Sequence, residues 1–386
     1  MKDIKFIAKD KQNGSLYHQP VVLGLEHGVT FSTGGDAFTL NDAIAGATKD
    51  AQVQGAQMVL RSVLSYTAAS RAMANDGKSF ESATKFLVGN MLRSMTRKLE
   101  IELLYGAGAT PAGSGAGVGY GAVSAVSGAG PYVITMTTAS WAPGIWAGSE
   151  GMIIEFADSG LTATHGTGVV TLVDMDARTV TITLSTGTAP VATDILFHNG
   201  AFGNEFAGIH KILSNTGSLF NISAATYNLW KGNSYNVGGQ LSIAHILTAA
   251  SRAVEKGLDQ KVKVYVNPRG WTNLISAETA RRTYDGSYKP GEFENGASSI
   301  KFHGQNGEIE VEPSIFVKEG FAYMLIMEEL VRIGSSDVTF KRPGQGDEFF
   351  RDLESAAGYE LRAYTDQAVF SSCPGKMCLL TGIVNA

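Results

Sequence analysis

The sequence predicts an α+β protein in which strands outnumber helices. Three observations support this fold class. One long amphipathic stretch fills residues 79–105, a block of short strand-like segments covers 131–203, and helices and strands are interspersed between 241 and 386. Many separated strands with few helices, and no regular βαβ alternation, are typical of the α+β class.

The long helix is predicted from Ser79 to Tyr105, with Ser79 placed as its N-terminal cap. Its apolar residues recur every three or four positions and form one stripe: Phe80, Ala83, Leu87, Met91, Met95, Leu99 and Leu103. At 1.5 Å per residue this helix spans roughly 40 Å, about twice the length of an ordinary globular helix.

A β-prone segment, 56–71, runs into this helix and has no partner strand beside it in the sequence. Alternate side chains of a strand point to opposite faces. Met58, Leu60 and Tyr66 therefore share one face, whereas Gln57, Arg61 and Ser65 share the other. Residues 1 to about 50, rich in glycine and polar groups, are expected to form an irregular extended arm.

The long helix is followed by a glycine-rich stretch and then by a series of strand-like segments. Residues 106–130 are rich in glycine and predict a flexible linker. The segments that follow have the residues and alternation of short strands, and they are 132–137, 152–156, 168–173 and 179–184. A turn at 174–178 joins the last two. Four or five such strands predict a small barrel inserted into the main fold.

The C-terminal half combines helices and strands. A second amphipathic helix is predicted over 241–256 with Gly257 as its stop, and a shorter one begins at Trp271 after the turn 267–270. The strand-like segments of this half are 261–266, 308–311, 321–327, 338–340, 359–364 and 377–383.

Composition excludes several classes of protein. The 386 residues carry a net charge of −5, so there is no basic excess for holding a nucleic-acid backbone. The first ten residues mix both charges, unlike a signal peptide, and no apolar run approaches the roughly 20 residues of a membrane span. Only two cysteines occur, which excludes a disulfide framework and favours folding in a reducing cytoplasm.

One motif suggests nucleotide chemistry. Gly77-Lys78-Ser79 opens a helix, as the end of a phosphate-binding loop does. However, that loop also needs a glycine five positions before Gly77, where this chain has Ala72. We therefore expect a capped helix with a solvated lysine, and keep a P-loop-like nucleotide hydrolase as an alternative.

No other residues assemble into a catalytic, cofactor or metal site. The seven histidines are dispersed, and Cys373 and Cys378 lack a second metal-binding pair. The four tryptophans, which could be sugar-binding platforms, are expected to fill corners of the fold: Trp141, Trp146, Trp230 and Trp271. A β-rich virion attachment protein that binds glycans through the 131–203 block is a second alternative.

The order of these elements resembles that of the major capsid proteins of tailed bacteriophages, the Hong Kong 97-type fold. An extended arm, a long helix, a glycine-rich crossover and a strand-rich C-terminus follow one another. The segment 264–274 is similar to the strand and helix of the family's axial domain. The segments 329–340 and 361–383 are similar to its returning strand and its tail.

The resemblance implies a domain organisation with these boundaries: N-terminal arm 1–28, extended loop 29–77, peripheral-domain spine helix and linker 78–130, β-rich insertion domain 131–205, peripheral return 206–240, axial domain 241–335 and peripheral C-terminal strands 336–386. The insertion departs from the minimal family fold. No Lys–Asn pair for a covalent crosslink stands out, so non-covalent locking of subunits is expected.

The function implied is self-assembly into the icosahedral head shell of a tailed double-stranded DNA phage, without enzymatic activity or a cofactor. Partners would be further copies in hexamers and pentamers, with scaffolding, portal or decoration proteins as candidates; the DNA would be enclosed without sequence readout, and no membrane is involved. Assembly would occur in the bacterial cytoplasm and the product is the virion. The expected inter-subunit contacts are Met58, Leu60, Arg61, Tyr66 and Arg71.

Overall fold

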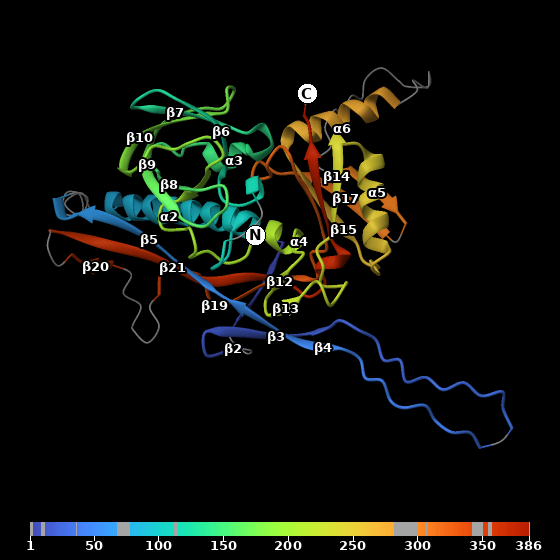
Figure 1. The fold of residues 1–386 in the computed structure, drawn as a ribbon. Coiled ribbons are helices and arrows are strands. Elements are labelled where there is room, and N and C mark those ends of the chain that lie inside the picture. The colour runs from blue at the N-terminus through green and yellow to red at the C-terminus, as the bar shows by residue number, and fades with distance from the viewer. Residues whose placement is uncertain are drawn as a thin grey trace.

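The computed structural model describes residues 3–8, 12–35, 37–67, 78–111, 115–281, 300–305, 307–341, 350–353 and 357–385. They form two mixed sheets, a closed barrel and a small three-stranded sheet that carries a projecting ribbon (Figure 1). None of the helices described is long and apolar enough to cross a membrane.

The first sheet, called the long sheet below, combines both ends of the chain. Its strands run in the order β1 (Lys5–Ala8), β19 (Leu330–Thr339), β21 (Gly358–Ser371) and β20 (Phe350–Asp352). Strand β5 (Ala56–Ser65) pairs antiparallel with β21 along its whole length. The strand that had no partner in the sequence therefore finds one about 300 residues further along its own chain.

The long helix is α2 (Lys78–Tyr105). It begins one residue before the predicted Ser79 cap, and side chains 78–84 lie outside the described residues, so that cap stays a prediction. The second half of the predicted stripe is confirmed, because Met91, Met95, Leu99 and Leu103 are all buried. Met91 packs with Leu361 and Ala363 of β21, which fixes the helix on the long sheet.

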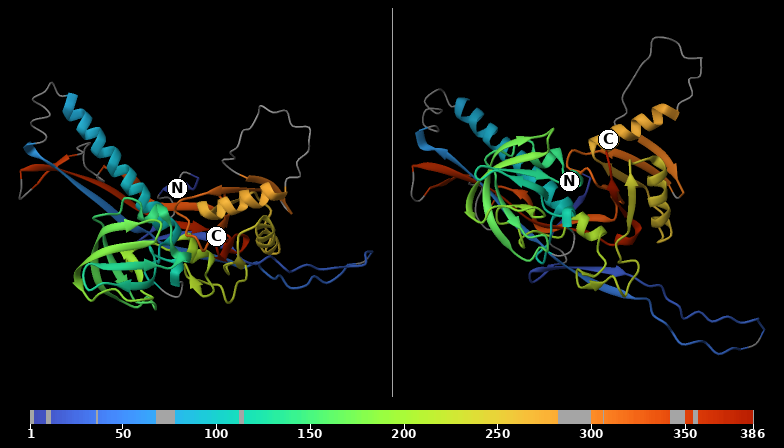
Figure 2. Two further views of the ribbon diagram at one scale, coloured as in Figure 1. Left: turned by 90° about the horizontal axis from the view of Figure 1, so that it is seen from above. Right: turned by 45° about the horizontal axis from the view of Figure 1, so that its top comes forward.

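The N-terminal region is more regular than the sequence predicts. Strands β2 (Gln12–Asn13), β3 (Leu16–Val22) and β4 (Thr48–Gln54) form the three-stranded base sheet. Beyond it residues 23–47, called the ribbon below, leave the body as a long hairpin without regular strands (Figure 1). In both views of Figure 2 the ribbon points away from the outer end of α2.

The barrel is closed by six antiparallel strands in the order β10-β7-β6-β11-β8-β9. These are β6 (Gly121–Ser127), β7 (Tyr132–Met136), β8 (Ile153–Ala157), β9 (Thr164–Asp174), β10 (Thr179–Gly187) and β11 (Ile195–His198), with a short helix α3 (Pro143–Trp146) between β7 and β8. The predicted barrel is confirmed, with six strands rather than four or five.

The predicted linker over 106–130 is wrong for much of its length. Residues 121–127 are the first barrel strand, and Val118 and Tyr120 just before it are buried. Here glycine permits close packing instead of flexibility: a Cβ on Gly119 would lie 2.6 Å from the Leu196 carbonyl oxygen. Composition therefore misled the prediction.

The second sheet, called the mixed sheet, has the order β14-β22-β18-β15-β17-β16. Its strands are β14 (Ser234–Gly239), β15 (Val262–Val266), β16 (Ile300–Gly304), β17 (Gly307–Pro313), β18 (Ala322–Leu325) and β22 (Cys378–Ile383). Helices α5 (Ile243–Val254) and α6 (Pro268–Arg281) pack beside it (Figure 1). Helix α5 begins two residues later than predicted, and Ser242 caps it by accepting from the His245 amide.

The last strand, β22, lies between β14 and β18 inside the mixed sheet. Its residues Cys378, Leu379 and Leu380 are fully buried there, so Cys378 is a packing residue. A short helix α4 (Ile209–Leu213) and the pair β12 (Ser218–Leu219) and β13 (Ile222–Ser223) connect the barrel back to this sheet.

Candidate functional site

Strand β5 places the predicted contact residues on two different faces. The inward face carries Met58 and Leu60, and Leu60 packs against the Met91 cluster under α2. The outward side carries Arg61 and, just beyond the strand, Tyr66, which is 56% exposed. Arg71 lies outside the described residues. The structure thus brings Met58 and Leu60 to the chain's own helix rather than to a free surface.

The exposed face of β5 is partly apolar. Val59 and Val63 are 53% and 51% exposed, and neither was singled out from the sequence. Arg61 lies between them and its Nε is 2.9 Å from an oxygen of Glu360 on β21. The period-2 pattern of the segment contained this signal, but it could not tell which face meets the helix.

Strand β5 also forms an edge of the long sheet. It pairs with β21 on one side, and no strand among the described residues pairs with its other side. An edge of ten residues with exposed valines is an unusual surface for an isolated subunit, because such edges pair readily with a second chain.

The ribbon is a projecting surface rich in apolar side chains. Six of its large apolar residues are more than half exposed, and they are Leu25, Val29, Phe31, Phe38, Leu40 and Ile44; Val22, at the end of β3, is exposed beside them. Phe31 is 90% exposed. Few hydrogen bonds cross the ribbon; one joins the His27 amide to the Ile44 carbonyl at 3.1 Å.

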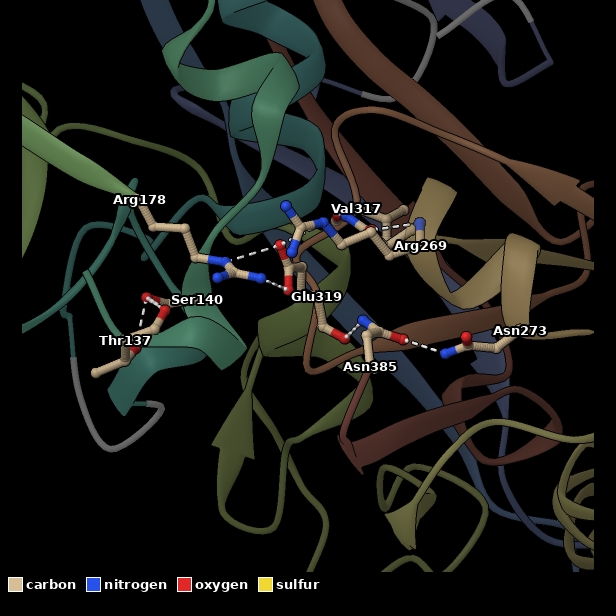
Figure 3. Close-up of polar contacts among 9 residues, drawn as sticks. Thr137, Ser140, Arg178, Arg269, Asn273, Val317, Glu319 and Asn385 are labelled. Atoms are coloured by element: carbon tan, nitrogen blue, oxygen red, sulfur yellow. Dashed lines mark hydrogen bonds and ion pairs between the residues drawn. The ribbon is translucent and has the colours of Figure 1, made fainter. Parts of the chain in front are cut away.

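A buried ion cluster ties the barrel to the mixed sheet. Arg178, in the turn between β9 and β10, donates from Nε and Nη2 to the two oxygens of Glu319 at 3.1 and 3.0 Å (Figure 3). Arg269 of α6 lies 3.6 Å from the same carboxylate. The Glu319 side chain is 1% exposed, so its charge needs these partners.

The C-terminal residues extend this cluster. Asn385 donates to the Glu319 carbonyl at 3.1 Å, and Asn273 of α6 donates to Asn385 at 3.3 Å (Figure 3). Backbone hydrogen bonds from Glu319 to Trp141 and from Gly320 to Ala139 join the two units directly, each at 2.9 Å. The barrel is therefore a braced part of the subunit.

Two buried lysines hold the barrel against α2 and the loop before β18. Lys98 of α2 donates to the Tyr120 hydroxyl at 2.9 Å, and burial followed by the neighbouring charge of Arg97 lowers the pKa of Lys98 to about 7. Lys318 donates to the carbonyls of Val118 and Gly119 at 3.1 and 3.0 Å. Burial lowers the pKa of Lys318 well below its usual value.

The tryptophans, the metal-binding residue types and the Gly77-Lys78-Ser79 motif were the features that suggested chemistry in the sequence. Trp141, Trp146 and Trp230 are fully buried, which confirms their packing role, and Trp271 is half-buried. Among the described residues no group of three or more His, Cys, Asp or Glu side chains is arranged to hold a metal ion. Gly77 lies outside the described residues, and β5, which precedes α2, is an antiparallel edge strand unlike the parallel strand before a phosphate-binding loop.

Comparison with solved structures identifies the fold. A chain of the cyanophage A-1(L) capsid aligns with 98% of this chain and 91% of its own length, with a TM-score of 0.52 and 10% sequence identity. This chain has the Hong Kong 97-type capsid fold.

Two other solved structures align with this chain at lower scores. The capsid of a native GTA particle covers 99% of this chain and 89% of its own, with 7% identity and a TM-score of 0.47. Mycobacterium phage Bobi covers 98% and 88%, with 9% identity and a TM-score of 0.46. No protein-family model and no curated protein matches the sequence.

Proposed function

We propose that this chain is the major capsid protein of a tailed double-stranded DNA bacteriophage. It would assemble with copies of itself into the icosahedral head shell that encloses the genome. The likeness to a capsid chain over 98% of the sequence supports this function. The ribbon and the open edge of β5 support it independently, because both are surfaces that a lone subunit leaves uncovered.

In this proposal each structural unit has a role in the shell. Helix α2 is the spine of the peripheral domain, and the mixed sheet with α5 and α6 is the axial domain that meets its neighbours around capsomer axes. The ribbon on its base sheet is the extended loop, which moves that loop from the predicted 29–77 to about 16–54. The barrel is the insertion domain, and its boundaries move from 131–205 to about 118–205.

The exposed ribbon is the observation that carries the proposal. Burying one large apolar side chain contributes about 1.5–3 kcal/mol, so a partner that covers the six exposed ones of the ribbon would gain a substantial free energy of binding. A second copy of the chain is the partner favoured here, because the same chain also provides an open strand edge with exposed Val59 and Val63. Each contact is modest, and a closed shell repeats it many times.

This arrangement replaces two of the predicted contacts. Leu60 packs under α2 and Met58 lies on the same face of β5, so we propose that the outer side of β5 meets the neighbour through Val59, Arg61 and Val63, with Tyr66 beside them. Arg71 remains a predicted contact. Locking would be non-covalent, with no cofactor and no enzymatic step.

The remaining partners follow from the proposed shell. The DNA would be enclosed without sequence readout, and scaffolding, portal and decoration proteins are candidate partners. The site of action would be the virion, after assembly in the bacterial cytoplasm. Within the part of the chain that the structure describes, no observation favours the nucleotide-hydrolase or glycan-binding alternatives.

A shortened ribbon tests the proposal. Deleting residues 52–74 would remove β5 from the long sheet and damage the subunit itself, so the deletion must fall elsewhere. Replacing 28–43 by a short turn closes the ribbon at the His27–Ile44 hydrogen bond and leaves both sheets intact. We expect a folded subunit, by circular dichroism, that forms no shells by sedimentation and electron microscopy. Normal shells from this variant would overturn the proposed role of the ribbon.

A further inference from the structure

The chain enters and leaves the barrel through one narrow crossing. The outgoing segment follows the end of α2, and the returning segment precedes α4. They meet at an isolated antiparallel bridge between Ala107 and Ala207, and the Gly208 amide donates to the Gly106 carbonyl at 2.9 Å. If the barrel moves relative to α2, the backbone at this crossing must bend or the contacts around it must break.

Two glycines allow the segments to approach this closely. A Cβ on Gly106 would lie 2.2 Å from the Phe206 carbonyl oxygen, and a Cβ on Gly208 would lie 2.6 Å from the Gly106 nitrogen. Both distances are far inside van der Waals contact. The backbones therefore touch directly, and side chains of the flanking residues add to the backbone hydrogen bond that joins them.

Two carboxylates form a reciprocal clasp across the crossing. Glu102, on the outgoing helix, accepts from the Phe206 amide of the returning segment at 3.1 Å. Glu205, on the returning segment, accepts from the Ala107 amide of the outgoing segment at 3.1 Å. Each segment thus contributes one acid and one backbone donor, and the two bonds must break together if the crossing opens.

The clasp lies at the boundary of two cavities. Glu205 lines both a cavity of about 980 Å³ beside the base of the ribbon and one of about 360 Å³ between β5, α2 and the barrel. Glu102 lines only the smaller cavity and is 6% exposed. Because the cavities open towards solvent and Glu205 is only half-buried, protons can reach both carboxyls.

The surroundings give the pair few compensating charges. The titratable and charged groups that face it come from α2, the barrel, α4 and the loop before β18, and they are Lys98, Tyr120, Glu155, His198, Lys211 and Lys318. Strand β5 contributes only uncharged side chains to the smaller cavity. Lys98 and Lys318 are themselves desolvated, and Glu155 adds a like charge beside Glu205.

We propose that Glu102 and Glu205 are a proton-operated clasp that holds the barrel against α2 at acidic pH and loosens as both carboxyls ionise. Two adjacent carboxylates in a poorly solvated crossing repel one another, whereas a proton on either removes the repulsion and leaves an oxygen for each amide. The inference rests on the fold alone and does not require the proposed function.

The direction and the pH window follow from linkage. Burial raises the pKa of Glu205 to about 7, and burial together with the Glu205 charge raises the pKa of Glu102 well above its usual value. A carboxyl whose pKa is higher in the closed state favours closure at low pH. That preference is lost as pH rises from the ordinary carboxyl range towards about 7, and further where Glu102 ionises.

Hydrogen exchange of the full-length wild-type protein tests the clasp without any substitution. Protection factors of peptides covering 106–108 and 202–208 would be measured by mass spectrometry from about pH 5 to about pH 8, each corrected for intrinsic exchange. We expect protection to fall by at least about tenfold over this range. Protection that stays constant with pH would overturn the proposal.

Two substitutions test whether Glu205 and Glu102 cause the pH dependence of the protection. Glu205→Gln keeps an amide oxygen for Ala107 but cannot ionise, so its protection should stay high at pH 8; Glu102→Gln is the independent second variant. Glu255→Gln, on the exposed end of α5, is the matched control and should follow the wild type. If both clasp variants lose protection with the wild-type pH dependence, the clasp residues are not the titrating groups.

Discussion

Arg178 and Glu319 join the barrel to the mixed sheet through two parallel hydrogen bonds of 3.1 and 3.0 Å. The carboxylate is almost completely buried and the arginine comes from a hairpin turn more than a hundred residues away. A planar guanidinium matches both carboxylate oxygens at once, which fixes the orientation of the turn as well as its distance. The inserted barrel is therefore braced at a point remote from the crossing through which its chain enters.

Removing this brace should destabilise the subunit. Arg178→Ala leaves Glu319 with only the longer Arg269 contact, and removing one partner of a buried ion pair costs up to about 3–5 kcal/mol. We expect the thermal unfolding midpoint to fall by several degrees, with Arg178→Lys intermediate because it keeps the charge but loses the fork. An unchanged midpoint for Arg178→Ala would show that the ion cluster does not brace the barrel.

The crossing glycines should tolerate no side chain. Gly106→Ala places a methyl group 2.2 Å from the Phe206 carbonyl oxygen, so the backbones must separate and break the bridge at Ala107. Gly89→Ala in α2 is the matched control, because its methyl group meets nothing within 4 Å. In chemical denaturation we expect Gly106→Ala to lose several kcal/mol, whereas Gly89→Ala gains about 0.5–1 kcal/mol. Equal effects would contradict the close contact.

The buried, neutral ring of His210 should make the folded protein less stable in acid. Its ring is buried against Phe321, shares a 3.0 Å hydrogen bond with the Tyr323 hydroxyl, and burial followed by the nearby Lys318 charge lowers its pKa to about 3. The unfolded chain binds a proton near pH 6.5 and the folded one does not, so stability falls as pH drops below that value.

The expected loss from His210 is about 2 kcal/mol at pH 5 relative to pH 7. It would be measured from urea midpoints across this range, and His210→Gln should show a shallower dependence than the wild type. His303→Gln changes an exposed histidine and serves as the control. The histidine explanation fails if His210→Gln and His303→Gln have the same slope.

A charge on the ribbon should block assembly without affecting the fold. Phe31→Asp removes the most exposed apolar side chain and would place a carboxylate in the proposed apolar contact. Ser32→Asp adds the same charge to the neighbouring residue and is the control. We expect Phe31→Asp subunits to sediment as small species while Ser32→Asp subunits form shells. Shells of normal yield from Phe31→Asp would exclude Phe31 from the contact.

Local patterns predicted most of the elements but not how distant ones pair. The 3.6-residue stripe located α2 and α5, and the strand-like segments located four of the six barrel strands and four of the six strands of the mixed sheet. The partner of β5 could not be predicted, because β21 lies about 300 residues away and nothing local specifies that register. For the same reason the sequence could not show that the face with Leu60 turns towards α2.

The linker prediction and the missed buried acids have physical explanations. A glycine-rich stretch has the same composition whether its glycines provide freedom or close contact, so the first barrel strand was interpreted as a linker. Glu102 lies within an apolar run at the end of α2, which was a usable sign that this acid is buried. Its partner Glu205 and the brace at Glu319 depend on tertiary contacts that no spacing in the sequence encodes.

The most direct test of the central claim is electron microscopy of the expressed full-length chain, alone and with a candidate scaffold protein. We predict closed icosahedral shells in which density for the ribbon of one subunit lies along the outer edge of β5 in its neighbour. A monodisperse monomer under both conditions, or shells in which the ribbon contacts no other subunit, would contradict this account.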